Sequence, residues 1–519
     1  MPGTRVDVLG FINDWVMDPD SSESLLWLHG LAGAGKSAIA SSVCHQLKER
    51  ADGRQCLGAS FFCKHDDKHL RDPALILPRI VTDLSTAYPT FGKAVAAALS
   101  KTPTLNTDAM MLQFKGLIKE PLTSLAESGQ GPLVVVVDAL DECGTAEDRR
   151  RLISILREMS GLAQWLKIVV TSRRDPDIRN AFSEPGNAFY QMDLNDWDNS
   201  DDILAFVRKR MKDIAISKGL PATWPGENKI RDLAQRGTPL FIWVDVAATF
   251  IQSGKKPNSR LDRVLEANSS GGEYAQLDVL YTAAIEDSFG SEEDNAEVFR
   301  DVVGMIVAVS THRPLPRSAL MALMTSDLVE DSTFNDTIDG LGSVLYEDLN
   351  NDSAIRLCHP SFMDFLTNPG RRCPTRFHID LAQQNTRLAM RCLRTMIDGP
   401  RGLKFNICDL KSSHRLNQDI VDLSEKVKSA ISDALRYSCL HWATHLGNAL
   451  REGRSRAVLY ELLISFFSGP RPLHWLEALS LLGDLKAAIA GLPLVVAWIQ
   501  VSFYILGYRN ASADNETYY

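Results

Sequence analysis

A glycine-rich run between an apolar segment and a helical segment constrains the fold of this chain more than any other feature. Residues 25–30 read LLWLHG, which predicts a buried strand, and residues 30–37 match the pattern G-x-x-x-x-G-K-S. From Ile39 onward, apolar residues recur four apart, as on one face of a helix. Glycines let the backbone curl so that its N–H groups point inward, and the start of a helix adds a positive dipole end. The sequence therefore predicts a strand–loop–helix unit that binds phosphate.

The residue types in this loop suit a nucleotide with a polyphosphate tail. We expect Lys36 to reach the β and γ phosphates as a point charge. The Ser37 hydroxyl is expected to be a ligand of Mg²⁺. The complete set of expected nucleotide contacts in the loop is Gly30, Gly33, Ala34, Gly35, Lys36 and Ser37.

Further apolar runs predict a parallel sheet around this loop. Four consecutive valines at 134–137 are typical of a strand that is covered on both faces. Residues 57–62 and 167–173 predict two more strands, and 189–194 predict an edge strand. Because helical segments separate these runs, we expect an α/β fold with a parallel sheet and flanking crossover helices.

Acidic residues follow the valine strand, about a hundred residues after the loop. Asp138 ends that strand, where a carboxylate can face Mg²⁺ through water. Asp141 and Glu142 come three and four residues later, and either could hold or deprotonate an attacking water. Arg173 ends the next strand, where a guanidinium could sense the γ phosphate. Asp141, Glu142 and Arg173 are therefore the expected catalytic residues.

The composition excludes some functions and leaves one segment open. The formal net charge of -9 over 519 residues argues against a protein that coats nucleic acid, so we expect no nucleic-acid partner. Nine scattered cysteines and the absence of an apolar N-terminal leader indicate a reducing, cytoplasmic location. Residues 487–508 carry no charged side chain and could just span a bilayer, but Pro493 and Gln500 favour a buried helical hairpin.

Three stretches together resemble the NACHT domain of the STAND class of signalling NTPases. They read LLWLHGLAGAGKS, LVVVVDALDEC and KIVVTSRRDPDI. The specific mark is the small Ala139 after Asp138, followed by the acidic pair Asp141 and Glu142. The large set of fungal NACHT proteins, which resemble the Nod-like receptors of animals, is the closest match. The chain departs from these proteins because no signalling domain is visible before the loop and no repeats are visible near the C-terminus.

The resemblance implies further site residues and a domain order. Residues 237–240 look like the family's GxP segment, so Pro239 is expected to pack against the base. Residues 357–366 look like the segment whose histidine touches the β phosphate of a bound diphosphate, which assigns that contact to His359. The expected parts are an N-terminal linker helix (1–20), the NACHT P-loop domain (21–197), a helical subdomain (198–268), a winged-helix-like domain (274–370) and a C-terminal helical region (371–519).

The function implied by the resemblance is a signalling switch with weak, Mg²⁺-dependent NTPase activity. Exchange of ADP for ATP would release the helical and winged-helix parts and permit self-oligomerisation, in innate-immunity-like or incompatibility signalling with unknown protein partners. ATP and ADP are favoured because no guanine-reading motif is visible, and GTP and GDP remain the alternative nucleotides. The competing hypotheses are a nucleotide-stabilised scaffold without hydrolysis and a P-loop remodeller or motor. A zinc site at Cys56, Cys63, His65 and His69 is a minor alternative, because its spacing suits no common finger.

Overall fold

The computed structural model divides the chain into two compact units. The first comprises Met1–Leu280 together with His359–Ser361, and the second comprises Tyr281–Cys358 and Phe362–Tyr519. The structure describes residues 3–50, 55–67, 69–106, 109–125, 131–266, 274–290, 293–324, 330–349, 352–397, 402–412 and 414–513. The linker expected at 269–273 lies outside these residues.

A five-stranded parallel sheet organises the first unit. Its strand order is β2-β3-β4-β1-β5, so β5 is an edge strand, as expected. The pairings of β1 with β4 and β5, and of β3 with β2 and β4, are all parallel. The strands are β1 (Leu25–His29), β2 (Leu57–Phe62), β3 (Leu133–Asp138), β4 (Leu166–Ser172) and β5 (Tyr190–Asp193).

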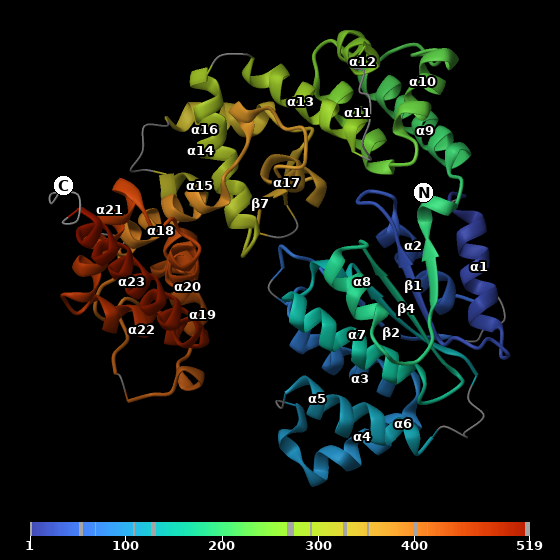
Figure 1. Ribbon diagram of the computed structural model, residues 1–519, viewed down its shortest axis with the longest axis horizontal. Helices are drawn as coiled ribbons and strands as arrows, with labels where there is room; N and C mark the ends of the chain where they lie inside the picture. The colour runs from blue at the N-terminus through green and yellow to red at the C-terminus, as the bar shows by residue number, and fades with distance from the viewer. Residues whose placement is uncertain are drawn as a thin grey trace. The chain divides into compact units, whose positions relative to one another are not determined.

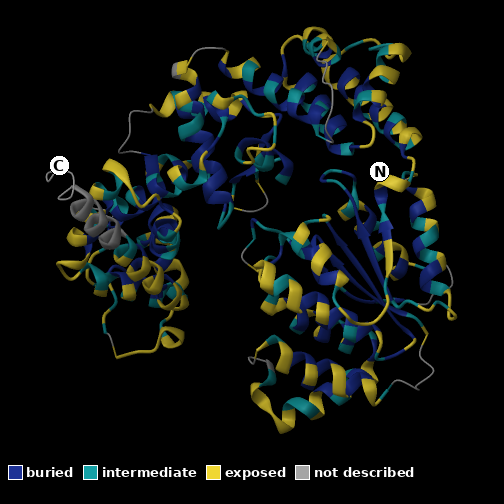
Figure 2. Cartoon of the chain, in the orientation of Figure 1, coloured by how far each residue is buried: buried dark blue, intermediate teal, exposed yellow. Residues whose placement is uncertain are grey.

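Helices cover both faces of this sheet, and the strands between them are buried (Figures 1 and 2). Alternate valines of β3 belong to different cores: Val135 and Val137 pack with α3, α7 and α8, and Val134 and Val136 pack with α1 and α2. The unalternated valine run is thus explained by a strand that is apolar on both sides. The predicted α/β fold, followed by a mostly helical region, is confirmed.

The helices of the first unit include an insertion for which we made no prediction. Between β2 and β3 the chain forms α3 to α6 and one π-helical turn, Phe114–Lys119. The helices are α1 (Val6–Met17), α2 (Lys36–Lys48), α3 (Ile76–Ala87), α4 (Pro89–Lys101), α5 (Met110–Gln113), α6 (Glu120–Thr123), α7 (Ala146–Ser160), α8 (Pro176–Ser183), α9 (Ser200–Lys218), α10 (Glu227–Gly237), α11 (Phe241–Ser253), α12 (Pro257–Glu266) and the first part of α13 (Ala275–Phe289), which passes into the second unit at Tyr281.

The start of α11 corrects one expectation. The apolar run at residues 239–251 predicts a helix with Pro239 in its first turn, but α11 begins at Phe241. Leu240 has extended backbone angles, φ −101° and ψ 106°, so the helix cannot begin before it. Pro239 instead follows a cis peptide bond and lies in the connection from α10.

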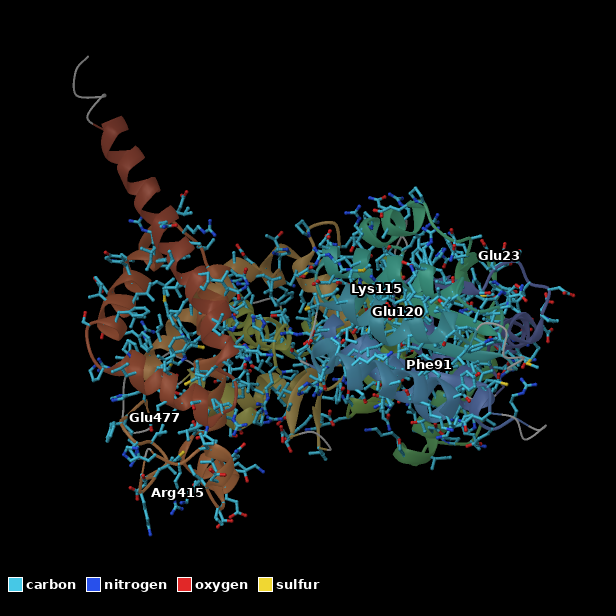
Figure 3. The ribbon with its side chains drawn as sticks, turned by 90° about the horizontal axis from the view of Figure 1, so that it is seen from below. Glu23, Phe91, Lys115, Glu120, Arg415 and Glu477 are labelled. Atoms are coloured by element: carbon cyan, nitrogen blue, oxygen red, sulfur yellow. The ribbon has the colours of Figure 1, made fainter. Side chains whose placement is uncertain are left out.

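The second unit is mostly helical, with one small sheet. Strands β6 (Leu345–Asp348) and β7 (Ala354–Leu357) pair antiparallel, as the two short strand-like runs predicted, and Pro316 forms a bridge to Ala354. Glu477, which Figure 3 labels, accepts hydrogen bonds from the backbone N–H groups of Asn406 and Ile407. The helices are α14 (Glu293–Ser310), α15 (Arg317–Met324), α16 (Asp331–Gly340), α17 (Pro360–Thr367), α18 (Leu381–Ile397), α19 (Leu423–Ala430), α20 (Asp433–Gly447), α21 (Gly453–Phe467), α22 (Arg471–Leu481) and α23 (Lys486–Ala513). The first residues of α17 belong to the first unit.

The C-terminal apolar segment forms one helix and not the hairpin that we expected. Helix α23 runs through Pro493 without a break in its assignment. It buries Val495 and Trp498, while Ile489 and Val496 are exposed. No helix among the described residues is both long enough and apolar enough to cross a membrane.

The first turn of α7 offers a test of this architecture. Thr145 Oγ1 accepts the Asp148 N–H at 3.3 Å, and the Asp148 side chain accepts the Thr145 N–H at 3.0 Å. This reciprocal cap satisfies two N–H groups that the helix itself leaves open. We expect Thr145→Ala to lower the free energy of unfolding by about 1 kcal/mol in urea denaturation. Thr145→Ser keeps the hydroxyl and should retain most of the stabilisation that the cap provides. The matched control is Thr86→Ala, at an exposed position in the last turn of α3 that caps no helix start, and it should be close to neutral. Equal losses for the two alanine variants would refute the cap.

Candidate functional site

The glycine-rich loop joins the carboxyl end of β1 to α2. Gly33 and Gly35 have φ values of +82° and +96°, in the left-handed region that favours glycine. A Cβ added to Gly33 would lie 2.0 Å from Cγ2 of Ile242, so a larger residue does not fit there. The Ile242 N–H also donates to the Gly33 carbonyl at 3.3 Å. The loop is therefore shaped as a phosphate cradle requires, and α11 packs against its outer side.

Lys36, at the first position of α2, carries the positive charge of the loop. Its Nζ donates to the carbonyls of Gly30 and Leu31, both at 2.9 Å. Among the described residues, no carboxylate lies within ion-pair distance of Nζ. Burial lowers the pKa of Lys36, and the nearby Asp141 opposes that shift. The ammonium group is thus held in place by neutral acceptors, which leaves its charge to attract an anion.

Two distant segments of the first unit also hold the loop. Arg5 Nη2 donates to the Ala34 carbonyl at 3.0 Å, and the Arg5 N–H donates to Asp202 at 2.8 Å. The Ala32 N–H donates to the Tyr274 hydroxyl at 3.1 Å. The loop is therefore bonded to the chain before α1 and to the residue just before α13, and Arg5 in turn is bonded to α9.

Asp138 ends β3 and is buried near the loop. Its carboxylate accepts hydrogen bonds from Thr171, on the neighbouring strand β4, and from Ser37. Burial raises the pKa of Asp138, and the charges of Glu142 and Asp141 add to that rise. The sequence placed Asp138 and Ser37 on one magnesium site, and the structure brings these two side chains together.

Asp141 and Arg173 bind each other across the ends of β3 and β4. The Arg173 N–H donates to Asp141 Oδ1 at 3.0 Å, and Arg173 Nε lies 3.2 Å from Asp141 Oδ2. One carboxylate therefore fixes both the backbone and the side chain of the arginine. This pairing keeps the guanidinium at the carboxyl edge of the sheet, where the sequence predicted it.

Glu142 contacts a residue that the sequence analysis used only for the zinc alternative. The backbone N–H of His65 donates to Glu142 Oε2 at 3.1 Å, and His65 Nδ1 lies 3.2 Å from the same oxygen. Burial raises the pKa of Glu142, but the hydrogen bonds and charge of His65, together with Arg173, outweigh burial and lower it below its ordinary value. Glu142 is therefore an ionised carboxylate at neutral pH.

His359 begins a three-residue segment, His359–Ser361, that belongs to the first unit, while Cys358 before it and Phe362 after it belong to the second. Its Nδ1 accepts the Ser361 N–H at 3.1 Å and lies 2.8 Å from the Ser361 hydroxyl. Burial and the positive charge of Arg173 lower the pKa of His359 to about 3. The ring is therefore neutral at neutral pH, and its proton sits on Nε2, for which no acceptor is found among the described residues and which can donate to an anion.

Pro239 is placed differently from the other predicted residues. It is exposed, and its carbonyl accepts a hydrogen bond from Asn199 at 2.8 Å. Phe241, two residues later, lies 3.7 Å from the position that a Cβ on Gly35 would take. Within the described part of the chain, no hydrogen bond or ion pair joins Pro239 to Lys36 or to the acidic residues, so its expected role stays a prediction.

The sequence analysis missed several residues that shape the site. Thr171 could have been found from strand pairing, because Val137 is opposite Val170 and the next pair is therefore Asp138 and Thr171. His65 follows the end of β2, which pairs with β3 up to Asp138. Arg5 and Tyr274 gave no comparable signal, since no strand pairing relates them to the loop.

The zinc alternative is not supported. His65 faces Glu142, and the Cys63 thiol hydrogen-bonds with Cys143, which together with burial raises the pKa of Cys63. In the part of the chain that the structure describes, no group of three or more His, Cys, Asp or Glu residues could hold a metal ion.

Comparisons with known proteins support the sequence motif over part of the chain. A family model described as "Nephrocystin 3, N-terminal" matches residues 11–173. No curated protein matches the chain.

Three solved structures are similar at 12% identity. A signal transduction ATPase with numerous domains and a tetratricopeptide repeat sensor, from Pyrococcus horikoshii, has a TM-score of 0.40; the similarity covers 98% of this chain and 64% of that one. A Walker-type ATPase of Pyrococcus abyssi has a TM-score of 0.33, and the similarity covers 69% of this chain and 94% of that one. Cdc6p from Pyrobaculum aerophilum has a TM-score of 0.29, and the similarity covers 69% of this chain and 90% of that one. With TM-scores this low, the similarities assign no function.

Thr171 provides a structural test of the site. Its hydroxyl donates to Asp138 and accepts the Ala139 N–H at 3.0 Å, and both partners are buried. Thr171→Val keeps the shape but leaves a buried N–H without a partner, so we expect a loss of about 1–3 kcal/mol in the free energy of unfolding. Thr171→Ser keeps the hydroxyl and should lose less. A valine variant as stable as the wild type would contradict the geometry described above.

Proposed function

We propose that this chain is a Mg²⁺-dependent, nucleoside-triphosphate-binding switch of the NACHT/STAND class. One observation carries the proposal: the Lys36 ammonium is fixed by the carbonyls of its own loop and has no carboxylate partner among the described residues. A half-buried positive charge inside a ring of glycine-rich backbone is suited to a polyphosphate tail. The match of residues 11–173 to the nephrocystin model and the quoted NACHT-like motifs agree with this assignment.

The residues of the site fit a magnesium–nucleotide complex. The backbone N–H groups of residues 33–37 and Lys36 would bind the phosphates, and Ser37 and Asp138 would hold the metal ion. Bound Mg²⁺ neutralises phosphate charge. Asp138 already accepts hydrogen bonds from Thr171 and Ser37, which keep its carboxylate aimed at the loop. Donors that fix an acidic ligand in this way raise its metal affinity.

Glu142 is the best candidate for the general base of a slow hydrolysis. It is ionised, because His65 and Arg173 lower its pKa despite burial. In the reaction, Glu142 accepts a proton from water as the water oxygen bonds to the γ phosphorus. The bond from that phosphorus to the β–γ bridging oxygen breaks, and its electron pair leaves with the diphosphate. Arg173, held by Asp141, would stabilise the charge on the transferred group.

His359 gives the switch its nucleotide sensitivity. A neutral ring with its proton on Nε2 can donate to the β phosphate of a diphosphate. A ligand shifts a conformational equilibrium only through different affinities for the two states, and a shift from 1:99 to 99:1 needs about 5.5 kcal/mol. One hydrogen bond to a charged group contributes about 1.5–3 kcal/mol, so His359 would supply part of that difference. Exchange to the triphosphate would then favour self-oligomerisation.

The cellular setting follows from the family resemblance alone. We propose a cytoplasmic protein with unknown protein signalling partners, in innate-immunity-like or incompatibility signalling. No nucleic-acid partner is proposed, because the net charge is -9 and Arg149, Arg150 and Arg151 already pair with acidic residues. ATP is preferred over GTP only because no guanine-reading motif is visible.

Two alternatives remain from the sequence. A nucleotide-stabilised scaffold would bind through Lys36 but would not hydrolyse, so measuring single-turnover hydrolysis separates it from the switch. A P-loop remodeller or motor would need a nucleic-acid track or a substrate pore, and we find no motif for either in the sequence.

Lys36 is the direct test of nucleotide binding. Lys36→Ala removes the charge that faces the phosphates, so we expect it to abolish binding of Mg·ATP and Mg·GTP in isothermal titration. The matched control is Lys48→Ala, because Lys48 is exposed on the same helix and should bind like the wild type. If Lys36→Ala binds either nucleotide as tightly as the wild type, the assignment of the site is wrong.

His359 tests the switch separately from binding. His359→Ala removes the Nε2 donor, so we expect ADP to dissociate about tenfold faster or more, given the energy of one charge-assisted hydrogen bond. We also expect a larger oligomeric fraction in sedimentation velocity. His414→Ala, at an exposed histidine, is the control. Unchanged ADP release together with an unchanged sedimentation profile would rule out this role for His359.

A further inference from the structure

The loop after β2 lies beside the loop that carries Glu142. Strand β2 pairs with β3 in parallel, with Phe62 opposite Asp138. The Cys63 N–H then donates to the Asp138 carbonyl at 2.9 Å, which extends the pairing by one step. Both chains therefore leave the sheet at the same edge. His65 comes three residues after β2, and Glu142 comes four residues after β3.

The path of this loop is fixed by contacts that do not use the His65 side chain. The Lys64 N–H donates to the Leu70 carbonyl at 3.3 Å, and the Arg71 N–H donates to the Asp67 carbonyl at 2.9 Å. The Gly144 N–H donates to the Arg71 carbonyl at 3.0 Å, which joins the loop to the segment just after Glu142. The imidazole can therefore be changed while the backbone around it keeps its hydrogen bonds.

His65 places two donors on one oxygen of Glu142. The backbone N–H and Nδ1 both reach Oε2, at 3.1 and 3.2 Å. An ionised carboxylate only accepts hydrogen bonds, so Nδ1 must carry a proton in this contact. The two donors fix the rotamer of Glu142, and no described residue donates a hydrogen bond to its other oxygen, Oε1, which a water molecule could therefore occupy. The side chains are 24% and 20% exposed, so solvent can reach the pair from one side.

Because other charged groups surround Glu142, its contact with His65 influences whether the carboxylate is ionised. The titratable groups whose charges interact with that of Glu142 include Lys36, Cys63, Asp138, Arg173 and His359. Burial alone would raise the pKa of Glu142, and the contributions of His65 are the largest that oppose it. Without His65, a water-activating carboxylate would be harder to keep ionised.

We propose that His65 is the positioning residue of Glu142: its ring and backbone N–H hold Oε2 so that Oε1 faces the water that attacks the γ phosphate. His65 touches neither water nor nucleotide in this role and acts only through the carboxylate. Hydrolysis thereby depends on the backbone that follows β2, because its path at His65 decides whether Glu142 is held. The inference rests on the proposed function, since it needs a nucleotide that Glu142 helps to hydrolyse.

Variants of His65 can show whether its side-chain hydrogen bond to Glu142 is needed for hydrolysis or whether the residue is only structural. In His65→Asn, the amide Nδ2 is bonded to Cγ as Nδ1 is in histidine, so the donor to Oε2 is kept at the same place. His65→Ala removes the donor. His69→Ala, at an exposed histidine in the same loop, is the matched control, and Glu142→Gln gives the rate without the base.

We expect a loss in the hydrolysis rate and not in binding. In single-turnover hydrolysis of Mg·ATP, His65→Ala should be about tenfold slower or more, which is part of the roughly 10²–10⁴-fold that a positioned general base contributes. Its affinity for Mg·ATP should be unchanged, and His65→Asn should recover most of the rate. His69→Ala should match the wild type.

The pH profile supplies a second readout. The hydrolysis rate falls in acid as Glu142 takes up a proton. The donors of His65 lower the pKa of Glu142, so their removal raises that pKa, and the acid limb of the profile should move to higher pH in His65→Ala. In His65→Asn the limb should lie between those of the wild type and the alanine variant.

Three outcomes would overturn the inference. They are a His65→Ala rate equal to that of the wild type, an asparagine variant as slow as the alanine variant, and a rate loss matched by an equal loss of nucleotide affinity. If instead the wild type binds no nucleotide, or Glu142→Gln hydrolyses as fast as the wild type, the proposed function fails first. A wild type that binds nucleotide, depends on Glu142 and tolerates His65→Ala contradicts only the role of His65.

Discussion

The account depends on one arrangement of charge: an ammonium group fixed by the backbone of its own loop. Lys36 Nζ donates to the carbonyls of Gly30 and Leu31, and two glycines with positive φ give the loop its curl. If Lys36 paired with Asp138 or Glu142, the loop would be neutralised from within. The acids are held by other partners instead: Asp138 by Thr171 and Ser37, Asp141 by Arg173, and Glu142 by His65. Each group of the site is thus kept ready for a ligand that carries both negative charge and a cation.

The sheet explains why these groups meet. Parallel strands end at the same edge, so residues that follow β1, β2, β3 and β4 arrive together although 143 positions separate Gly30 from Arg173 in the sequence. The loop after β1 brings Lys36, the loop after β2 brings His65, and the ends of β3 and β4 bring the acids and Arg173. Contacts from Arg5, Ile242 and Tyr274 then hold the loop from outside. The loop is therefore joined by hydrogen bonds to the chain before α1, to α11 and to the residue just before α13.

Strong local patterns in the sequence predicted much of the fold and of the candidate site. Contacts between segments far apart in the chain were not predicted. The valine run of β3, the loop at Gly30–Ser37 and the helix after it are local signals, and the structure confirms their elements. The start of α11 was missed, because the extended backbone of Leu240 overrides a proline that is favourable in a first turn. The hairpin expected near Pro493 was wrong, since α23 continues through that residue. The pairings of Arg5, Tyr274 and His65 depend on how distant segments pack, which no periodicity in one sequence reveals.

The most direct test of the central claim is the nucleotide that the purified chain retains. Denaturing the protein and separating the released small molecules by anion-exchange chromatography measures its amount, its base and its phosphorylation state. The account predicts a nucleoside diphosphate or triphosphate in roughly stoichiometric amount, which exchanges with added nucleotide when Mg²⁺ is present. A chain that carries no nucleotide, and still carries none after incubation with millimolar Mg·ATP or Mg·GTP, would contradict it.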